Sequence, residues 1–286
     1  MFYKYVDEKN EHLHLLSADG IDWKPLTGTS TIGNEVLAKN LTWWAVFCAL
    51  AELGYVKQKE KINDKYIETP YQKRLEAMVH RYNEIRLMGL EDWITLLDKA
   101  YKAHATTSNK AKTKGTNLHL ELESFVKGEM KKQAHLLTYS PKIQPFIDWS
   151  RKYVKRFIAS EFHCYSERLW CGGIGDFLAE LNEIKLDTGT IADGTIVLGD
   201  FKSSKECYLN QFTQTGGYAI QVSENGLFDA TGKHNLKLDK SIGALMVVPF
   251  GAEKLEPEKY IKCNVKDFEK GFECTAYLYK LLGFCE

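Results

Sequence analysis

The sequence contains no long hydrophobic run. Its 286 residues are 44% hydrophobic, but no stretch approaches the roughly 20 consecutive apolar residues that a membrane-spanning helix requires. The first residues, MFYKYVDEKNEHLHLL, also lack the basic and then apolar pattern of a secretion signal. We therefore expect a soluble, cytoplasmic protein.

Paired cysteines and an excess of charge are missing as well. The seven cysteines include no C-x-x-C pair, which favours reduced thiols over a disulfide framework or a zinc ribbon. The 38 basic and 38 acidic residues cancel, so composition alone does not indicate a nucleic-acid partner. No G-x-x-x-x-G-K-[ST] loop occurs, so the sequence carries no P-loop motor of its own.

The pattern of apolar and polar residues changes along the chain. The alternating first 16 residues predict a hairpin, and apolar residues at helical spacing then predict helices over 34–54, 68–89, 90–104, 108–128 and 140–158. From residue 162 onward, β-rich stretches separated by turn residues predict a sheet of at least three or four strands. Two further helices are expected over 207–226 and 264–283.

Two of these expected strands carry aspartates where a strand normally buries apolar residues. Asp176 lies in CGGIGDFLAEL and Asp200 in IVLGDFKSSKE, and a fold-back between the strands could bring the two together. Buried carboxylates repel one another unless a cation balances them, and hard oxygen ligands favour Mg²⁺ or Mn²⁺. Lys202 falls on the same strand face as Asp200, because side chains alternate with period two.

This arrangement suits the hydrolysis of a phosphodiester. A metal ion lowers the pKa of a bound water and offsets charge on the phosphate, while a neighbouring lysine can orient that water. The alternative reading is an ordinary edge pair of Asp200 and Lys202, since D-x-K occurs by chance in many chains. Glu180 shares the strand face of Asp176 and is a reserve ligand.

Several motifs together resemble the PD-(D/E)XK nuclease superfamily, within it the RecB-like and phage exonuclease branch. The resemblance covers the chain from about Leu26 onward, and the motifs occur in the order of that branch. The segments that carry it are KGTNLHLELE with His119, YSERLWCGGIGD with Glu167 and Asp176, GDFKSS with Asp200 and Lys202, and QTGGY with Gln214 and Tyr218.

The resemblance implies a role for each matching residue. The implied metal ligands are His119, Asp176, Asp200 and the carbonyl of Phe201. The implied catalytic residues are Asp176, Asp200, Lys202, His119 and Glu167. Gln211, Gln214 and Tyr218 lie on one helix face, as a polar strip that could reach the catalytic lysine or a DNA phosphate, and they are expected to bind substrate together with Lys114, from a lysine-rich stretch. No iron–sulfur cluster is expected, because the cysteines lack the spacing found in relatives that carry one.

These observations lead to an expected architecture and function. We expect an α/β restriction-endonuclease-like core, a mixed sheet flanked by helices, over 106–286, with an N-terminal hairpin and helical lobe over 1–105. The resemblance implies an Mg²⁺- or Mn²⁺-dependent deoxyribonuclease, an exonuclease acting on DNA ends in recombination, repair or replication in a bacterial or phage-infected cell, with a recombination or replication protein as a further partner. The alternatives are a catalytically silent DNA-binding or assembly subunit, an endonuclease, and an RNA-directed or small-phosphate hydrolase.

Overall fold

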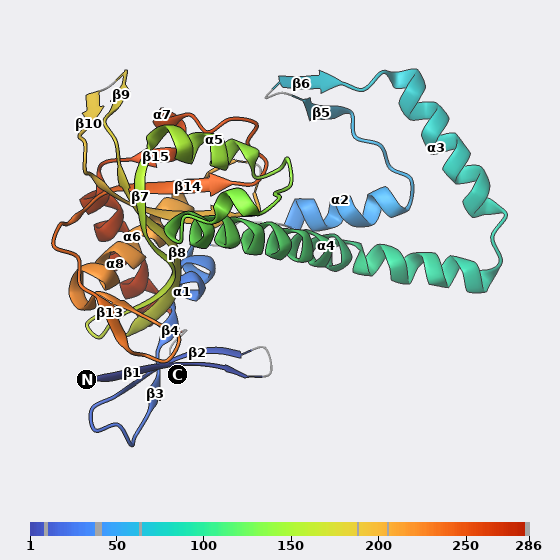
Figure 1. The fold of residues 1–286 in the computed structure, drawn as a ribbon. Coiled ribbons are helices and arrows are strands. Elements are labelled where there is room, and N and C mark those ends of the chain that lie inside the picture. The colour runs from blue at the N-terminus through green and yellow to red at the C-terminus, as the bar shows by residue number, and fades with distance from the viewer. Residues whose placement is uncertain (9–10, 38–41, 63–64, 188, 205, 284–286) are drawn as a thin grey trace. The chain divides into compact units, whose positions relative to one another are not determined.

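The computed structural model describes residues 1–8, 11–37, 42–62, 65–187, 189–204 and 206–283 (Figure 1). They form two compact units: a larger unit of Met1–Ala38 with Gly115–Glu286, and a smaller unit of Lys39–Lys114. The expected division at residue 105 is therefore corrected, because residues 1–38 belong with the C-terminal part of the chain. Helix α4 (Leu90–Met130) begins in the smaller unit and ends in the larger one.

The larger unit is built on a mixed, eight-stranded sheet. Its order is β13-β12-β7-β8-β11-β14-β15, and β4 pairs with β8 off this path. Strand β11 runs parallel to β14 and antiparallel to β8. The strands are β4 (Thr27–Gly28), β7 (Val154–Ser166), β8 (Cys171–Leu181), β11 (Ile196–Lys202), β12 (Leu227–Phe228), β13 (His234–Leu236), β14 (Ile242–Pro249) and β15 (Ile261–Lys262). The predicted mixed sheet with flanking helices is confirmed.

Helices cover both faces of this sheet and make three layers (Figure 1). Residues of β8 alternate between the faces: Phe177 packs with the end of α4 and with α5 (Gln144–Tyr153), while Leu178 packs with α6 (Leu209–Asn225) and α8 (Val265–Leu281). The period-two alternation of a strand explains this division. Helix α1 (Thr29–Val36) packs on α6 and α8, and α7 (Pro257–Tyr260) precedes β15.

Helix α6 contains two glycines in its middle because α8 lies against it there. A Cβ at Gly216 would lie 2.6 Å from the backbone carbon of Phe268, and one at Gly217 would lie 2.8 Å from the ring of Phe272. Real Cβ atoms do not approach other atoms so closely. The glycines, which disfavour a helix by about 1 kcal/mol each in isolation, are therefore required by the packing of the two helices.

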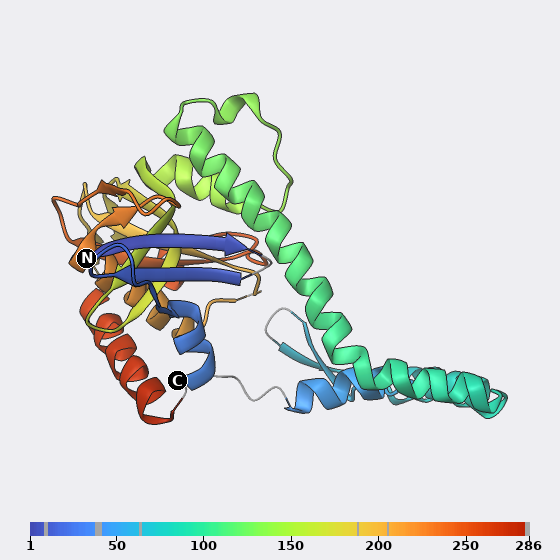
Figure 2. The ribbon, with the colours of Figure 1, turned by 90° about the horizontal axis from the view of Figure 1, so that it is seen from below.

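The N-terminal hairpin was correctly predicted. Strands β1 (Phe2–Glu8) and β2 (Glu11–Ser17) pair antiparallel along their length, and β3 (Lys24–Pro25) extends the pair (Figure 2). Tyr3 and Leu16 bury their side chains against Tyr165 and Phe228 of the large sheet. This apolar contact attaches the hairpin to the larger unit. A second small hairpin, β9 (Ile184–Leu186) with β10 (Gly189–Ile191), interrupts the connection between β8 and β11.

The smaller unit contains α2 (Thr42–Glu52), the hairpin β5 (Lys59–Ile62) with β6 (Lys65–Glu68), α3 (Tyr71–Arg86) and the first part of α4. The predicted helix over 34–54 is two helices, α1 and α2, and the predicted helices over 90–104 and 108–128 are one helix of 41 residues. Ser108 is a weak start signal, and the segment has no proline to break a helix. No helix in the described ranges is both long enough and apolar enough to cross a lipid bilayer.

The docked hairpin makes the stability of the fold sensitive to acid. Burial lowers the pKa of His14 to about 4, and its Nδ1 lies 2.7 Å from the Tyr3 hydroxyl. The unfolded chain takes up this proton near pH 6.5, whereas the folded chain takes it up only near pH 4. The contribution of neutral His14 to the free energy of unfolding is therefore present above pH 6.5 and is lost as the pH falls from 6.5 to 4. The complete loss amounts to about 3 kcal/mol.

We expect His14→Gln to remove most of this difference. The free energy of unfolding, measured by urea denaturation between pH 7.5 and 4, should fall less steeply with acid in this variant than in the wild type. His104→Gln is the control, since His104 is exposed in α4. Parallel pH profiles for His14→Gln and wild type would contradict the assignment.

Candidate metal centre

Strands β8 and β11 bring Asp176 and Asp200 together at the centre of the sheet. Phe177 pairs with Gly199 in the antiparallel register, which places the next residues, Asp176 and Asp200, across from one another. The amide of Phe201 donates a hydrogen bond of 2.5 Å to Oδ2 of Asp176. The chain between the two aspartates passes through β9 and β10 before it returns, so the fold-back inferred from the sequence is the arrangement in the structure.

Both carboxylates are buried. Asp176 is 7% exposed and Asp200 is 3% exposed. Burial raises the pKa of Asp200 to about 6; the ammonium of Lys202 opposes this rise and the carboxylate of Asp176 adds to it. Oδ2 of Asp200 lies 2.7 Å from Nζ of Lys202, yet among the described residues it receives no hydrogen bond of acceptable geometry. A buried carboxylate oxygen with this capacity left over is suited to a cation.

A second group of ligand atoms lies beside Asp176. Nε2 of His119, on α4, is 3.1 Å from Oδ1 of Asp176 and 3.3 Å from Oε1 of Glu161, on β7. Ligand atoms of these three residues lie within 4.8 Å of one another. Burial lowers the pKa of His119, but its contacts with Asp176 and Glu161 outweigh this effect and raise the pKa to about 10. The imidazolium therefore balances two carboxylates in the absence of another cation.

Glu161, and not Glu167, accompanies this histidine. Ser160 pairs with Phe177 and Phe162 with Gly175, so the register of β7 and β8 places Glu161 across from Asp176. Glu167 is exposed in the turn that joins the two strands, six residues further along and therefore roughly 20 Å away along an extended chain. The expectation that Glu167 lies at the metal site is corrected. The turn at 167–170 could have revealed this from the sequence, because it fixes the register of β7 against β8 and so the residue that lies across from Asp176.

The backbone at Glu161 is unusual. Its φ is 50°, in the left-handed region, although it lies within a strand. Such a conformation costs a non-glycine residue on the order of 1–3 kcal/mol and occurs most often at functional sites. The contact with His119 lowers the pKa of Glu161, against the opposing effect of its burial. This attraction helps to hold the strained residue in position.

Lys202 is held by a chain of polar side chains from α6. Its Nζ donates a hydrogen bond of 3.1 Å to Oε1 of Gln214, and Nε2 of Gln214 donates one of 2.8 Å to the hydroxyl of Tyr218. Burial raises the pKa of Tyr218 far above its usual value, so the hydroxyl stays protonated. A Cβ at Gly173 would lie 2.5 Å from the Tyr218 ring, which explains one glycine of the GGIGD segment. The predicted polar strip on α6 therefore faces Lys202.

Other predicted residues have different positions or contacts. Gln211 caps the start of α6: its side chain accepts a hydrogen bond of 2.8 Å from the amide of Tyr208 and donates to Ser204. Glu180, the reserve ligand, forms an ion pair of 2.7 Å with Arg156 of β7. Lys114 belongs to α4, and its side chain lies outside the described residues. The side chain of Gln211 is therefore already engaged within the chain, and the predicted substrate contact of Lys114 stays a prediction.

The residues that are brought together fit a hard divalent cation. Three carboxylates and one imidazole offer mainly oxygen ligands, the set that Mg²⁺ and Mn²⁺ prefer over softer metals. Asp200 on β11 and Glu161 on β7 lie on either side of Asp176, because β8 runs between those two strands, and His119 contacts both Asp176 and Glu161. This donor set could hold one ion at Asp176 or share two.

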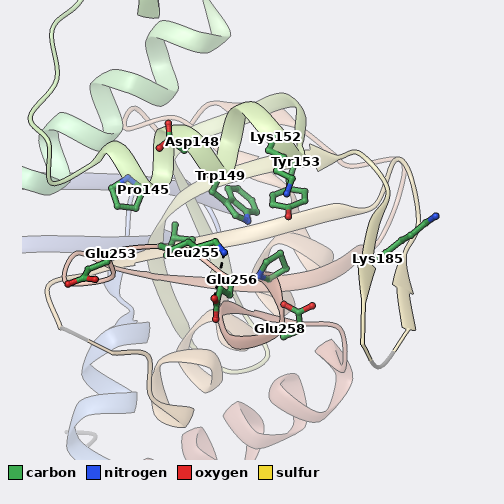
Figure 3. A pocket seen from close by; sticks show the side chains of 12 residues that line it. Pro145, Asp148, Trp149, Lys152, Tyr153, Lys185, Glu253, Leu255, Glu256 and Glu258 are labelled. Carbon is green, nitrogen blue, oxygen red and sulfur yellow. Dashed lines mark ion pairs between the residues drawn. The ribbon is translucent and has the colours of Figure 1, made fainter. Parts of the chain in front are cut away.

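A separate hollow lies elsewhere on the larger unit (Figure 3). It has a volume of about 330 Å³ and is walled by α5, by the segment 253–258 and by Lys185 of β9. Trp149 lines it, with an indole nitrogen that is buried and has no hydrogen-bond partner among the described residues. None of the metal-centre residues lines this hollow, so its chemistry is distinct from theirs.

Comparison with protein-family models finds no match for this chain, and no curated protein sequence matches it either. The assignment of a function therefore rests on the residues and their geometry.

We expect metal binding to stabilise the protein through Asp200. Ligand binding to the folded state contributes RT ln(1 + [L]/Kd), about 2.7 kcal/mol at 100 times Kd, so saturating Mn²⁺ should raise the melting temperature by roughly 5 °C. Asp200→Asn should lose most of this increase while remaining folded without metal, because it removes a buried carboxylate. Asp239→Asn, at an exposed acid, is the control. An equal increase in Asp200→Asn and wild type would refute the site.

Variants of Glu161 and Glu167 can be compared to test which of the two glutamates lies at the metal site. Glu161→Gln keeps the shape of the side chain but loses a ligand charge, so we expect the Mn²⁺ affinity, measured by isothermal titration calorimetry, to fall by about 10- to 100-fold. Glu167→Gln should leave the affinity unchanged, since Glu167 lies in an exposed turn. The reverse result would restore the assignment made from the sequence.

Proposed function

We propose that this chain is a metal-dependent deoxyribonuclease with a PD-(D/E)XK core. The observation that carries the proposal is the convergence of Asp176, Asp200 and Lys202 on one face of two paired strands, with the hydrogen-bonded pair Gln214 and Tyr218 behind the lysine. The alternative, an ordinary ion pair of Asp200 and Lys202 at a sheet edge, does not account for the buried Asp176 beside them or for the contacts of Lys202 with Gln214. The order of the motifs along the chain supports the same conclusion.

The residues divide the chemistry between them. Asp176 and Asp200, with His119 and Glu161 beside them, would hold Mg²⁺ or Mn²⁺. When bound, the ion lowers the pKa of a water molecule and offsets charge on the phosphate. A carbonyl ligand from Phe201 remains part of the proposal through the resemblance, and the Phe201 amide already orients Asp176. The burial of both aspartates keeps bulk water from weakening these interactions.

Lys202 is suited to positioning the attacking water. An ammonium has three N–H donors; one donates to Gln214, and Asp200 lies beside the group. At least one donor is therefore free for a water or a phosphate oxygen. Gln214 fixes the rotamer of the lysine, and Tyr218 fixes the orientation of the Gln214 amide. The relay makes Gln214 and Tyr218 positioning residues, which is the first of the two alternatives expected for this strip, contact with the lysine or with a DNA phosphate.

The proposed substrate is DNA, attacked from an end. This part follows from the resemblance to RecB-like and phage exonucleases and not from the geometry. As part of the same proposal, the protein acts in recombination, repair or replication. Its lysine- and arginine-rich segments would supply affinity for the phosphate backbone without reading sequence.

We expect Lys202→Ala to lower kcat/KM for DNA cleavage by roughly 100- to 1,000-fold, as for the loss of one preorganised donor. The measurement uses end-labelled single- and double-stranded DNA with Mg²⁺, Mn²⁺ or a chelator, and covalently closed circles to separate exonuclease from endonuclease activity. Lys237→Ala, an exposed lysine, is the control.

Full activity in the presence of chelator, or in Lys202→Ala, would refute the proposed mechanism. Intact DNA beside cleaved RNA or a cleaved mononucleotide would move the protein to another class of phosphodiesterase. Binding of DNA by the wild type without cleavage in any metal would favour the silent subunit.

A further inference from the structure

Two consecutive helices of the smaller unit each carry an apolar seam. We define the α3 seam as Tyr71, Leu75, Met78 and Tyr82, and the α4 seam as Leu90, Ile94, Leu97 and Tyr101. Within each seam the residues are four, three and four positions apart. This is the spacing of the a and d positions of a heptad, which places all four side chains in one line along a helix that faces another helix.

Both seams are exposed. Their eight side chains are between 37% and 78% exposed, and α3 buries none of its residues. The residues that α4 does bury within the smaller unit, Leu96, Ala100 and Ala103, lie on a different face of the helix. Scattered single apolar residues on a surface need no explanation, but two continuous seams of this length mark an interaction surface.

The charges beside the seams show which helix each one fits. Arg74, Arg81 and Arg86 occupy the positions that flank the α3 seam, and Arg81 also forms an ion pair of 2.7 Å with Glu84 of the same helix. Glu91 and Asp98 occupy the corresponding positions beside the α4 seam. In paired helices these flanking positions select the partner through opposite charges. An α3 seam therefore complements an α4 seam better than it complements a second α3.

Within one chain, the two seams do not meet. Arg74 donates a hydrogen bond to the carbonyl of Val56, and Arg81 donates one to the carbonyl of Glu52. These two hydrogen bonds fix α3 to the last residue of α2 and to the segment that follows it. The side chain of the same Glu52 forms an ion pair of 2.7 Å with Lys99 on α4. Lys99 lies on a face of α4 away from its seam, and Arg74 and Arg81 make their contacts from beside the α3 seam, so the eight seam side chains themselves stay exposed.

We propose that the smaller unit is a self-association module, in which the α3 seam of one copy packs against the α4 seam of a second copy, and the reverse. A twofold axis makes this contact twice. The three tyrosines can each bury roughly 150–250 Å² when fully covered, and the five aliphatic side chains are smaller, so the eight side chains, about half exposed, offer on the order of 800 Å². Each partner of a standard protein interface buries about that area.

The test is the oligomeric state of the full-length protein, measured by sedimentation velocity over a range of concentrations. Wild type should form a dimer. Leu75→Glu in the α3 seam and Ile94→Glu in the α4 seam should each weaken the dimer by more than about 100-fold, because each places a charge in an apolar contact. Asn83→Glu, on another face of α3, is the matched control and should remain dimeric, and circular dichroism checks that all variants keep their helices.

Mixing the two seam variants tests the pairing itself. Each variant alone loses both contacts of the dimer, but a mixed pair keeps one intact contact, between the α3 seam of the Ile94→Glu chain and the α4 seam of the Leu75→Glu chain. The mixture should therefore regain dimers that neither variant forms alone.

A monomeric wild type, a dimer that tolerates both glutamates, or a mixture that stays monomeric at concentrations well above the wild-type Kd would each overturn the proposal. These outcomes are independent of cleavage, so they separate self-association from the proposed nuclease function.

Discussion

The repulsion between two buried carboxylates is the constraint around which the larger unit is organised. Asp176 and Asp200 lie opposite one another, directly beyond the pair Phe177 and Gly199 at which the pairing of β8 and β11 ends, and both are almost without exposure to solvent. An unbalanced charge in such a place costs several kcal/mol. Two cationic groups balance the carboxylates: Lys202 lies beside Asp200, and protonated His119 lies beside Asp176.

The side chains of the site come from several elements of the three-layer architecture. Strand alternation turns Asp176, Asp200 and Lys202 toward the face that α6 covers, so Gln214 can reach the lysine. His119 comes from α4, which covers the opposite face, and reaches Asp176 together with Glu161 from the neighbouring strand. Because five separate elements contribute (β7, β8, β11, α4 and α6), the geometry of the site depends on the packing of the whole larger unit. The close contact of α6 with α8, which the two glycines allow, is part of that support.

The smaller unit is built by different rules. Its helices bury few side chains, and polar contacts to one connecting segment hold α3 in place. A large apolar surface is left exposed, in contrast to the well-packed layers of the larger unit. A partner that covered this surface would add its binding free energy to the stability of the module. The two units of the chain therefore divide the protein into a region of fixed polar geometry and a region suited to association.

Local patterns in the sequence were sufficient for part of the site. The alternation of a strand placed Asp200 and Lys202 on one face, and the four-residue spacing on a helix placed Gln214 with Tyr218. Hydrophobic patterns also predicted a sheet and most of the helices, and the mixed order of its strands was expected only from the resemblance. They did not predict the uninterrupted α4, because the start and stop signals near Ser108 are weak beside the helical propensity of the residues around them.

The sequence by itself determined which residue types are available for chemistry: two strand aspartates, a lysine two positions beyond the second, and a histidine on a helix. Only the tertiary structure decided which glutamate joins them. That choice depends on the register of β7 against β8, and a shift of register changes every neighbour across the pair without changing any local pattern. The same reason explains why residues 1–38 belong to the larger unit: the contacts of the hairpin with Tyr165 and Phe228 join parts of the chain that are far apart in sequence.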